Sequence, residues 1–210
     1  KMVGHIDNAV IFYHEPYASS ASEMVTELVQ YFNEKIKIGR PEAEALLAGI
    51  MLDTKNFIIK TGVRTFEAAA YLRKMGADTV EVRKLFASTM EAYQRKAKLV
   101  ANAQVYKGCA IAWSTERDDT EIQVTAAQAA DELLNISGVQ ASFLMFEQGK
   151  GVSYSARSMG QLNVQIIMEK LGGGGHHTMA GAQTPGITMD EARQRLREAI
   201  DQYFEENSRK

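Results

Sequence analysis

Apolar residues early in the chain recur every three to four positions, which is the period of an amphipathic helix. The first such pattern begins at Ser20-Ala21-Ser22-Glu23, a capping box whose serine accepts a hydrogen bond from a backbone N–H of the first turn. The helices predicted in this way are 20–32, 40–53, 66–76 and one that opens at Asp78, followed by a connecting helix at about 89–103. The short run AVIFYHE at 9–15 is β-rich, ends before Pro16 and predicts a strand.

After residue 104 the pattern changes to short apolar runs that alternate with helical ones. Gly149-Lys150-Gly151 separates two of these runs and is a hairpin signal. The predicted strands are 105–114, 139–148 and 151–158, and the predicted helices are one opened by a capping box at Thr125, one at 163–171 and one from Thr188 to about 206. Four glycines are predicted to form a loop into a further strand. The order β-α-β-β-α-loop-β-α predicts a mixed α/β module behind a mostly helical first region.

The composition narrows the classes of function. The length of 210 residues suggests one large or two small domains, with 45% hydrophobic and 24% charged residues as in ordinary globular proteins. The net charge of −2 supplies no positive field for long nucleic acid, so phosphate would have to bind at a local site. Cys109 is the single cysteine, which excludes an intrachain disulfide and a cysteine zinc site.

The sequence LGGGGHHTMAG at 171–181 is the most unusual segment. Glycine allows close approach of a ligand to the main chain, and successive free N–H groups form a concave anion site. A histidine at the end of such a turn can donate a hydrogen bond or a charge to phosphate. The alternative is a helix C-cap followed by a flexible turn, and spacing alone favours neither. His177 would point away from His176 if the chain is extended there.

Arg157 lies near the end of the predicted strand 151–158. Asn163 begins the predicted helix that leads into the glycines. Arginine suits bidentate binding of phosphate or carboxylate. The alternatives are that Asn163 is only an N-cap and that Arg157 is a solvated residue at a strand end. If Arg157, Asn163 and residues 173–176 converge, they form a polar pocket of the size of a nucleotide.

Two further candidates lie in the helical region. Asp53 ends the apolar helix ALLAGIML, where a carboxylate meets the unfavourable end of the helix dipole and a divalent cation would compensate it. An exposed loop aspartate is the alternative, and one carboxylate alone cannot hold a metal ion. Ser19 and Ser20 precede a helix N-terminus that could hold phosphate, although capping is the more common role for Ser20.

Several segments together resemble the C-terminal catalytic half of DHH-family phosphodiesterases, in particular the GdpP-type cyclic-di-AMP phosphodiesterases of Gram-positive bacteria. They span nearly the whole chain: EPYASSASEMVTELVQY, GIMLDTKNF, TGVRTFEAAAYLR, VTAAQAADELLNISGVQASF and SARSMGQLNVQIIMEKLGGGGHHTMAGAQ. The last contains the hallmark of the DHH-associated domain, a GGGH followed by xxAAG. Met179 replaces the first alanine of that hallmark, directly beside the expected site.

The resemblance implies a two-domain α/β enzyme. Residues 1–85 would be the C-terminal part of a DHH lobe whose parallel sheet is mostly missing. Residues 86–103 would be a connecting helix, and 104–210 a mixed-sheet DHH-associated domain that binds substrate. The substrate-binding residues expected are Ser19, Ser20, Arg157, Asn163, Gly173, Gly174, Gly175 and His176.

The complete family site, as the resemblance implies, holds two Mn²⁺ ions that activate a water for attack on phosphorus, giving linear pApA from cyclic-di-AMP. Of its ligands only the aspartate of a GIxLDT segment is present, as Asp53, because the sequence contains no DHH triplet and no DxD pair. We therefore expect a fragment that begins just past the DHH motif and is inactive by itself. The family also implies a cytoplasmic domain whose parent is anchored in the bacterial cell membrane.

Two alternatives stay open beside the enzyme fragment. One is a nucleotide- or RNA-binding module without catalysis, since related DHH-associated domains help alanyl-tRNA synthetases to bind tRNA. The other is an exonuclease of very short oligoribonucleotides, an activity of close relatives. Asp53 favours an enzyme, because a pure binding module has no need of it. Helices without their sheet would expose apolar faces, so we expect a homodimer that binds a cyclic or short linear dinucleotide.

Overall fold

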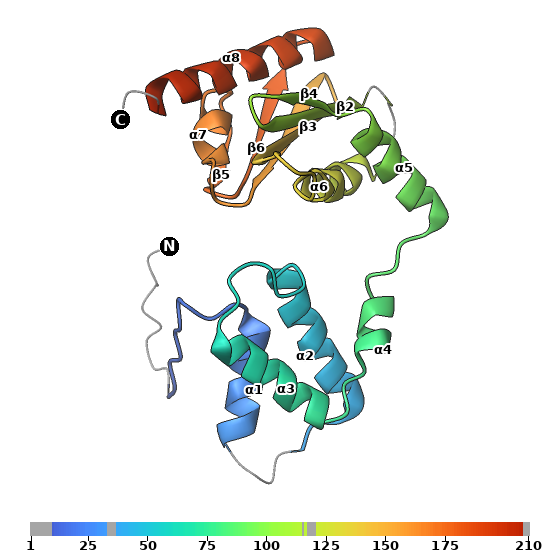
Figure 1. Cartoon of the computed structure of the whole chain (residues 1–210), viewed down its shortest axis with the longest axis vertical. Coiled ribbons are helices and arrows are strands. Elements are labelled where there is room, and N and C mark those ends of the chain that lie inside the picture. The colour runs from blue at the N-terminus through green and yellow to red at the C-terminus, as the bar shows by residue number, and fades with distance from the viewer. Residues whose placement is uncertain (1–9, 33–36, 115, 117–120, 208–210) are drawn as a thin grey trace. The chain divides into compact units, whose positions relative to one another are not determined.

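The computed structural model of the chain describes residues 10–32, 37–114, 116 and 121–207. It divides into two compact units, Lys1–Ala87 and Ser88–Lys210, which we call unit 1 and unit 2 and describe separately. Their helices, and the strands except β1, are labelled in Figure 1. Within the described residues, none of the helices combines the length and the apolar composition that a membrane crossing requires.

The described part of unit 1 consists of helices around a small apolar core. They are α1 (Ala21–Phe32), α2 (Arg40–Asp53), α3 (Val63–Lys74) and α4 (Thr79–Lys84). Buried side chains such as Leu47, Ile50 and Leu72 form this core. α1 and α2 approach closely because Gly49 faces Ser22, whose Oγ would lie 2.1 Å from a Cβ at position 49.

In unit 1 most of the predicted helices are confirmed, and the predicted strand is not. The helices predicted at 20–32 and 40–53 and the helix opening at Asp78 are confirmed. The third helix begins at Val63 instead of after Thr65, whose Oγ1 accepts the N–H of Gly62 (3.1 Å) inside the first turn. The strand predicted at 9–15 is wrong, because residues 10–15, the described part of this segment, form no strand. A strand needs a neighbour for its N–H and C=O groups, and the described part of unit 1 supplies no strand to pair with it.

Unit 2 contains a six-stranded mixed sheet with the order β1-β2-β3-β4-β6-β5. Its strands are β1 (Gln104–Tyr106), β2 (Cys109–Ser114), β3 (Ala141–Gln148), β4 (Gly151–Ser158), β5 (Gly174–His176) and β6 (Met179–Pro185). β2 and β3 run parallel and are connected through α6 (Ile122–Leu133). The other neighbouring strands pair antiparallel. The predicted mixed α/β class is confirmed.

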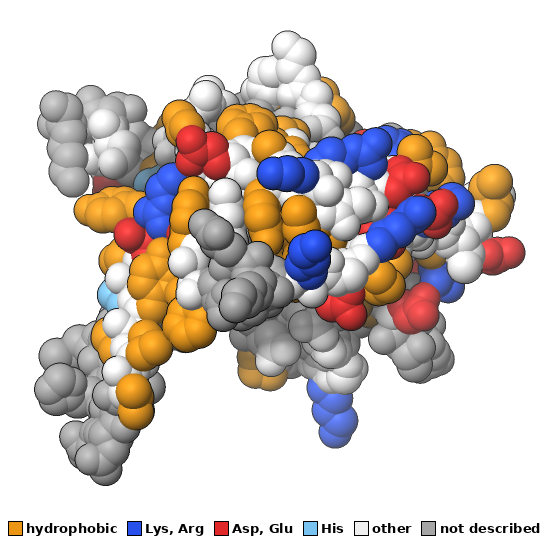
Figure 2. Space-filling model, turned by 90° about the horizontal axis from the view of Figure 1, so that it is seen from below, with side chains coloured by type: hydrophobic (Ala, Val, Ile, Leu, Met, Phe, Trp, Pro, Cys, Tyr) orange, Lys and Arg blue, Asp and Glu red, His pale blue; other side chains and the backbone are white. Residues whose placement is uncertain are grey.

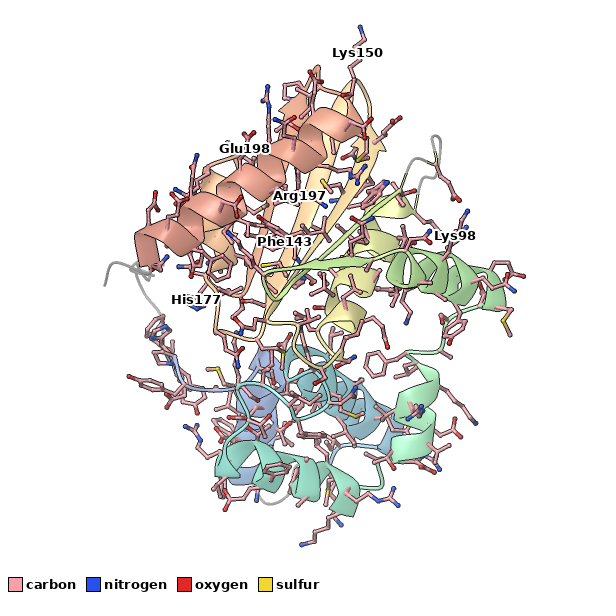
Figure 3. The ribbon with its side chains drawn as sticks, turned by 45° about the horizontal axis from the view of Figure 1, so that its top comes forward. Lys98, Phe143, Lys150, His177, Arg197 and Glu198 are labelled. Atoms are coloured by element: carbon pink, nitrogen blue, oxygen red, sulfur yellow. The ribbon has the colours of Figure 1, made fainter. Side chains whose placement is uncertain are left out.

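Helices cover both faces of this sheet (Figure 1). α7 (Val164–Glu169) and α8 (Met189–Asn207) lie on one face, and α5 (Met90–Ala101) and α6 lie on the other, which we call the α6 face. Successive residues of a strand point to opposite faces, so β3 supplies Phe143 to the core under α8 and Leu144 to the core under α6. Figure 3 shows Phe143 in the layer between α8 and the sheet. Each side chain of the central strands therefore has a defined face.

Two element predictions for unit 2 are wrong in detail. The run predicted as one strand at 105–114 is a hairpin, because Lys107 (φ 49°) and Gly108 (φ 74°) turn the chain between β1 and β2. Thr125 does not open α6, which begins at Ile122, and it is buried within the helix. The Lys-Gly pair and the capping-box pattern are both present in the sequence. The first forms the turn of a hairpin, and the second lies inside a helix with its threonine buried.

The segment around the glycines is more regular than predicted. Part of the predicted loop is β5, which pairs with β6. The hairpin of β3 and β4 and the caps at Asn163 and Thr188 are as predicted: Asn163 Oδ1 accepts the N–H of Gln165 (3.1 Å), and Thr188 Oγ1 accepts the N–H of Glu191 (3.3 Å).

Candidate functional site

The four consecutive glycines have different structural roles. Gly172 has a φ of 78° and turns the chain out of α7. Gly173 and Gly175 lie so close to β6 that a Cβ would stand 2.1 Å from Gly181 O in the first case and 2.5 Å from a backbone carbon in the second. Around Gly174 no atom lies within 4 Å of the position of a Cβ. The fold therefore requires three of the glycines, and the fourth leaves space for a ligand to approach the main chain.

Three residues from neighbouring strands form one row on the α6 face. Arg157 of β4 pairs with Met179 of β6, which pairs with His176 of β5. Side chains of directly paired residues project from the same face. Ala156 is buried in the core under α7 and α8, so Arg157 belongs to the other face. The structure brings the predicted Arg157 and His176 into this row, with Met179 between them.

Arg157 is a largely buried cation with incomplete compensation. Its side chain is 12% exposed, and its Nε lies 3.6 Å from Asp131 Oδ1 of α6. Its Nη1 donates to Ala156 O (2.9 Å), whereas the buried Nε has no hydrogen-bond partner among the described residues. Burial lowers the pKa of Arg157 from its ordinary value, and the Asp131 carboxylate acts in the opposite direction. A guanidinium binds oxyanions through charge-assisted hydrogen bonds, so the exposed part of this side chain is a candidate contact for an anion.

The adjacent residues His176 and His177 are both exposed but differ in their partners. His177 Nε2 lies 2.9 Å from Gly160 O, and His177 O accepts the N–H of Val164 (3.0 Å) at the start of α7. In the described part of the chain, His176 makes no side-chain hydrogen bond. Figure 3 shows His177 and Lys150 at opposite ends of the sheet, so the row lies far from the β3–β4 turn. His177 stabilises the turn, and His176 is the imidazole available to a ligand.

Asn163 is used as a helix cap. Besides the capping bond of its side chain, its N–H donates to the hydroxyl of Tyr203 in α8 (3.0 Å). α7 packs on the face of the sheet opposite to the α6 face. The cap is thus the observed role, and contact of Asn163 with a nucleotide stays a prediction.

Ser19 and Ser20 are both buried and both engaged within unit 1. Ser20 Oγ accepts the N–H of Glu23 (3.0 Å), which is the predicted N-cap bond. Ser19 Oγ donates to Glu23 Oε2 at 2.5 Å, and this carboxylate is itself buried. These contacts fix the entry into α1, and a role of the two serines in substrate binding stays a prediction.

Asp53, the last residue of α2, is exposed and precedes an unusual turn. The next residues Lys55, Asn56 and Phe57 have φ values of 48°, 57° and 64°. A left-handed conformation costs a non-glycine residue on the order of 1–3 kcal/mol, so the surroundings must hold it. The buried Thr54 contributes, because its Oγ1 donates to a carbonyl of α2 (2.7 Å) and accepts the N–H of Phe57 (3.0 Å).

The residues that the structure describes do not complete a metal site around Asp53. Among them, no group of three or more His, Cys, Asp or Glu side chains could hold a metal ion. One exposed carboxylate supplies only one of the several oxygen ligands that a hard cation such as Mn²⁺ needs. The predicted pair of Mn²⁺ ions does not fit these residues alone.

Two features of the site were not predicted from the sequence. Thr54 has a structural role in holding the turn after Asp53. Beside the Arg157 row lies a second row of small residues, in which Gly174 pairs with Gly181 and Gly181 pairs with Ser155. Alternation along GVSYSARS already places Ser155 and Arg157 on one face, so that signal was available. The pairing of the strands, by contrast, depends on contacts between distant segments.

Known proteins are similar to this chain in sequence and in fold. Residues 110–206, which lie in unit 2 and include the glycines and Arg157, match the DHHA1 domain. The resemblance of unit 2 to a DHH-associated domain is confirmed.

The particular relatives are cyclic-di-AMP phosphodiesterases. The chain is 52% identical over 202 residues to the cyclic-di-AMP phosphodiesterase GdpP of Geobacillus thermodenitrificans and 51% identical over 203 residues to GdpP of Bacillus subtilis. It is 47% identical over 202 residues to the cyclic-di-AMP phosphodiesterase PdeA of Listeria monocytogenes. Each match covers 95% of this chain but only 30–31% of the relative, so the chain corresponds to one part of these proteins.

A solved structure shares the fold. The exopolyphosphatase-related protein from Bacteroides fragilis matches with a TM-score of 0.82 over 94% of this chain and 61% of that chain. The two sequences are 24% identical, so this likeness concerns the fold.

Proposed function

We propose that this chain binds the substrate of a cyclic-di-AMP phosphodiesterase, and that unit 2 holds a phosphate of the dinucleotide. The observation that carries the proposal is the row of Arg157, Met179 and His176 beside the open Gly174. About half of the residues are identical to those of proteins named as cyclic-di-AMP phosphodiesterases, which supports this substrate class.

The chemistry of phosphate binding follows from these residues. The Arg157 guanidinium donates charge-assisted hydrogen bonds to phosphate oxygens, and the ring of His176 donates a further one. A side chain at position 174 would occupy the space through which phosphate reaches the main-chain N–H groups, so glycine is required there for binding. Arg157 is only 12% exposed, so solvent screens its interaction with the anion less than it screens an exposed ion pair.

Calorimetric titration of the chain with cyclic-di-AMP tests the proposal. We expect Arg157→Gln to weaken binding by about a hundredfold and His176→Ala by about tenfold, corresponding to about 2.8 and 1.4 kcal/mol. His177→Ala is the matched control, because its ring bonds to the loop before α7, and we expect a change within about threefold. No binding by the unsubstituted chain, or equal losses for the two histidine variants, would contradict the proposal.

Hydrolysis of cyclic-di-AMP to linear pApA, with Asp53 as one ligand of Mn²⁺, extends the proposal to the whole protein. Anchoring of that protein in a membrane stays a prediction from the resemblance.

The homodimer is supported by large apolar side chains at the surface of unit 1, among them Val10, Phe12, Tyr31 and Phe66. Figure 2 shows such orange side chains exposed beside charged ones. Sedimentation over a range of concentrations would measure the association, and a monomer at all concentrations would exclude it.

A short-oligoribonucleotide exonuclease is the second candidate. Its support is a likeness of 26% identity over 188 residues to the bifunctional oligoribonuclease and PAP phosphatase NrnA of Thermus thermophilus, over 89% of this chain and 57% of that protein. Titration with cyclic-di-AMP, pApA and a four-nucleotide RNA separates the candidates. Tighter binding of the RNA than of both dinucleotides would favour the second one.

A further inference from the structure

A hollow of about 590 Å³ lies on the α6 face of the sheet, beside the glycines. Its walls and floor include Gln123 of α6, Ser153 and Ser155 of β4, Gly181 and Gln183 of β6, and Gly173. The volume is in the range of about 300–1,000 Å³ that is typical of small-molecule sites. None of the described residues that line it carries a charge.

The hollow continues the phosphate-binding row in regular steps along the strands. Next to the row of Arg157 comes the row of small residues, and after it Gln183 pairs with Ser153. Residues two positions apart in a strand are separated by about 7 Å, so the third row lies roughly 14 Å from the first. Over this distance the α6 face changes from charged to small to amide-bearing residues.

The uncharged lining suits the neutral part of a nucleotide. Phosphate would lose its hydration without gaining a cation there, whereas a planar base can lie over Gly181 and Ser155, which have little or no side chain. The carboxamide of Gln183 offers a donor and an acceptor side by side, which matches the N6 and N7 edge of adenine. Ser153 Oγ donates to Gln148 Oε1 (2.8 Å), so a second carboxamide at the hollow is held in place.

We propose that this hollow is the base subsite of the chain. The adenine of the nucleotide whose phosphate is held by Arg157 and His176 lies over Ser155 and Gly181, and Gln183 reads its edge. This inference rests on the proposed function, because that function supplies the phosphate that places the base in the hollow. It adds a specificity-determining residue, Gln183, outside the glycine and histidine motif.

The test compares a ligand that has a base with one that has none. Gln183→Leu is titrated with cyclic-di-AMP and with ribose 5-phosphate, and we expect the affinity for cyclic-di-AMP to fall about tenfold or more while that for ribose 5-phosphate changes less than about twofold. Gln183 is exposed, so the substitution leaves the core intact, as circular dichroism would verify. Gln128→Leu is the matched control, since Gln128 is an exposed glutamine of α6 outside the lining of the hollow. This variant should bind both ligands as tightly as the unsubstituted chain.

The outcomes separate this inference from the proposed function. If Gln183→Leu binds cyclic-di-AMP as tightly as the unsubstituted chain, the base subsite is wrong, although the Arg157 dependence can still hold. If it loses both ligands equally, Gln183 acts on the phosphate site or on the fold, and the base subsite is again wrong. If the unsubstituted chain binds neither ligand, the proposed function fails and the base subsite with it.

Discussion

The two units hold their candidate residues in different ways. In unit 2, Arg157 and His176 stand on β4 and β5, which both pair with β6, in a sheet packed between apolar clusters of twenty and twelve buried residues. In unit 1 the described core has seven buried residues, and Asp53 ends a helix next to a strained turn. Arg157 is fixed by the register of β4, which pairs with strands on both sides, and His176 by the pairing of β5 with β6, whereas Asp53 is followed by a turn that Thr54 holds. We therefore expect unit 1 to be the less stable unit and its site the less rigid one.

The largest expected effect tests whether the units differ in stability. Leu72→Ala in unit 1 and Leu196→Ala in unit 2 remove the same side chain from positions with 0% exposure. Each should lower the free energy of unfolding of its own unit by about 3 kcal/mol. Calorimetry should show two transitions, of which Leu72→Ala shifts only the lower one and Leu196→Ala only the upper one. A single transition that both variants shift would mean that the units unfold as one cooperative body.

The glycines test how far the fold of unit 2 determines its site. Gly175→Ala places a Cβ 2.5 Å from backbone atoms of β6, at a φ of 152°, and should lower the free energy of unfolding by about 2–3 kcal/mol. Gly174→Ala meets no atom and should change it by less than about 1 kcal/mol. Thermal unfolding measures both. Equal losses would show that Gly174 is also required by the fold and is not left open for a ligand.

An ion pair in unit 1 shows how its helices are joined. Arg64 of α3 binds Glu27 of α1 through both carboxylate oxygens, with Nε–Oε1 and Nη2–Oε2 distances of 2.7 Å. The Arg64 guanidinium lowers the pKa of Glu27 below its usual value of 4.5. Because the folded pKa is lowered, the stabilisation is present above that usual value and is lost as the pH falls through the folded pKa.

Glu27→Gln should therefore lower the free energy of unfolding of unit 1 by about 1 kcal/mol at pH 7, since Arg64 is half-exposed and solvent screens the pair. Urea denaturation between pH 7 and pH 3 measures this. The difference from the unsubstituted chain should stay constant down to about pH 5 and shrink below it. A difference that grows as the pH falls would exclude the ion pair as its cause.

The smallest effect concerns Met179, which lies between Arg157 and His176 and is 50% exposed. Met179→Ala should change the free energy of unfolding by less than about 0.5 kcal/mol, as for other exposed positions. It removes a flexible side chain from the row, so the affinity for cyclic-di-AMP should rise about twofold. Weaker binding of the variant would show that the thioether contacts the ligand instead of obstructing it.

The parts of the fold that the sequence predicted are those with local causes. Ser20, Asn163 and Thr188 begin helices through hydrogen bonds to residues two or three positions away. The strand predicted at 9–15 is wrong because a strand needs a partner, and such partners are distant in the sequence. The run 105–114 is predicted as one strand because its pattern alone does not show that Lys107-Gly108 forms the turn of a hairpin. The site follows the same rule. Arg157 and His176 were predicted individually and from the resemblance, but their row and the hollow beside it require the register of three strands.

Both outer strands of the sheet, β1 and β5, are only three residues long. An outer strand exposes unpaired N–H and C=O groups that can template pairing with another chain, and a short one offers too few of them. In β5 two of the three residues are glycines, which are among the residues least favourable for β-pairing. The segment that leaves main-chain groups accessible to a small anion is therefore a poor edge for aggregation, so unit 2 can keep an open binding surface without a strand to protect it.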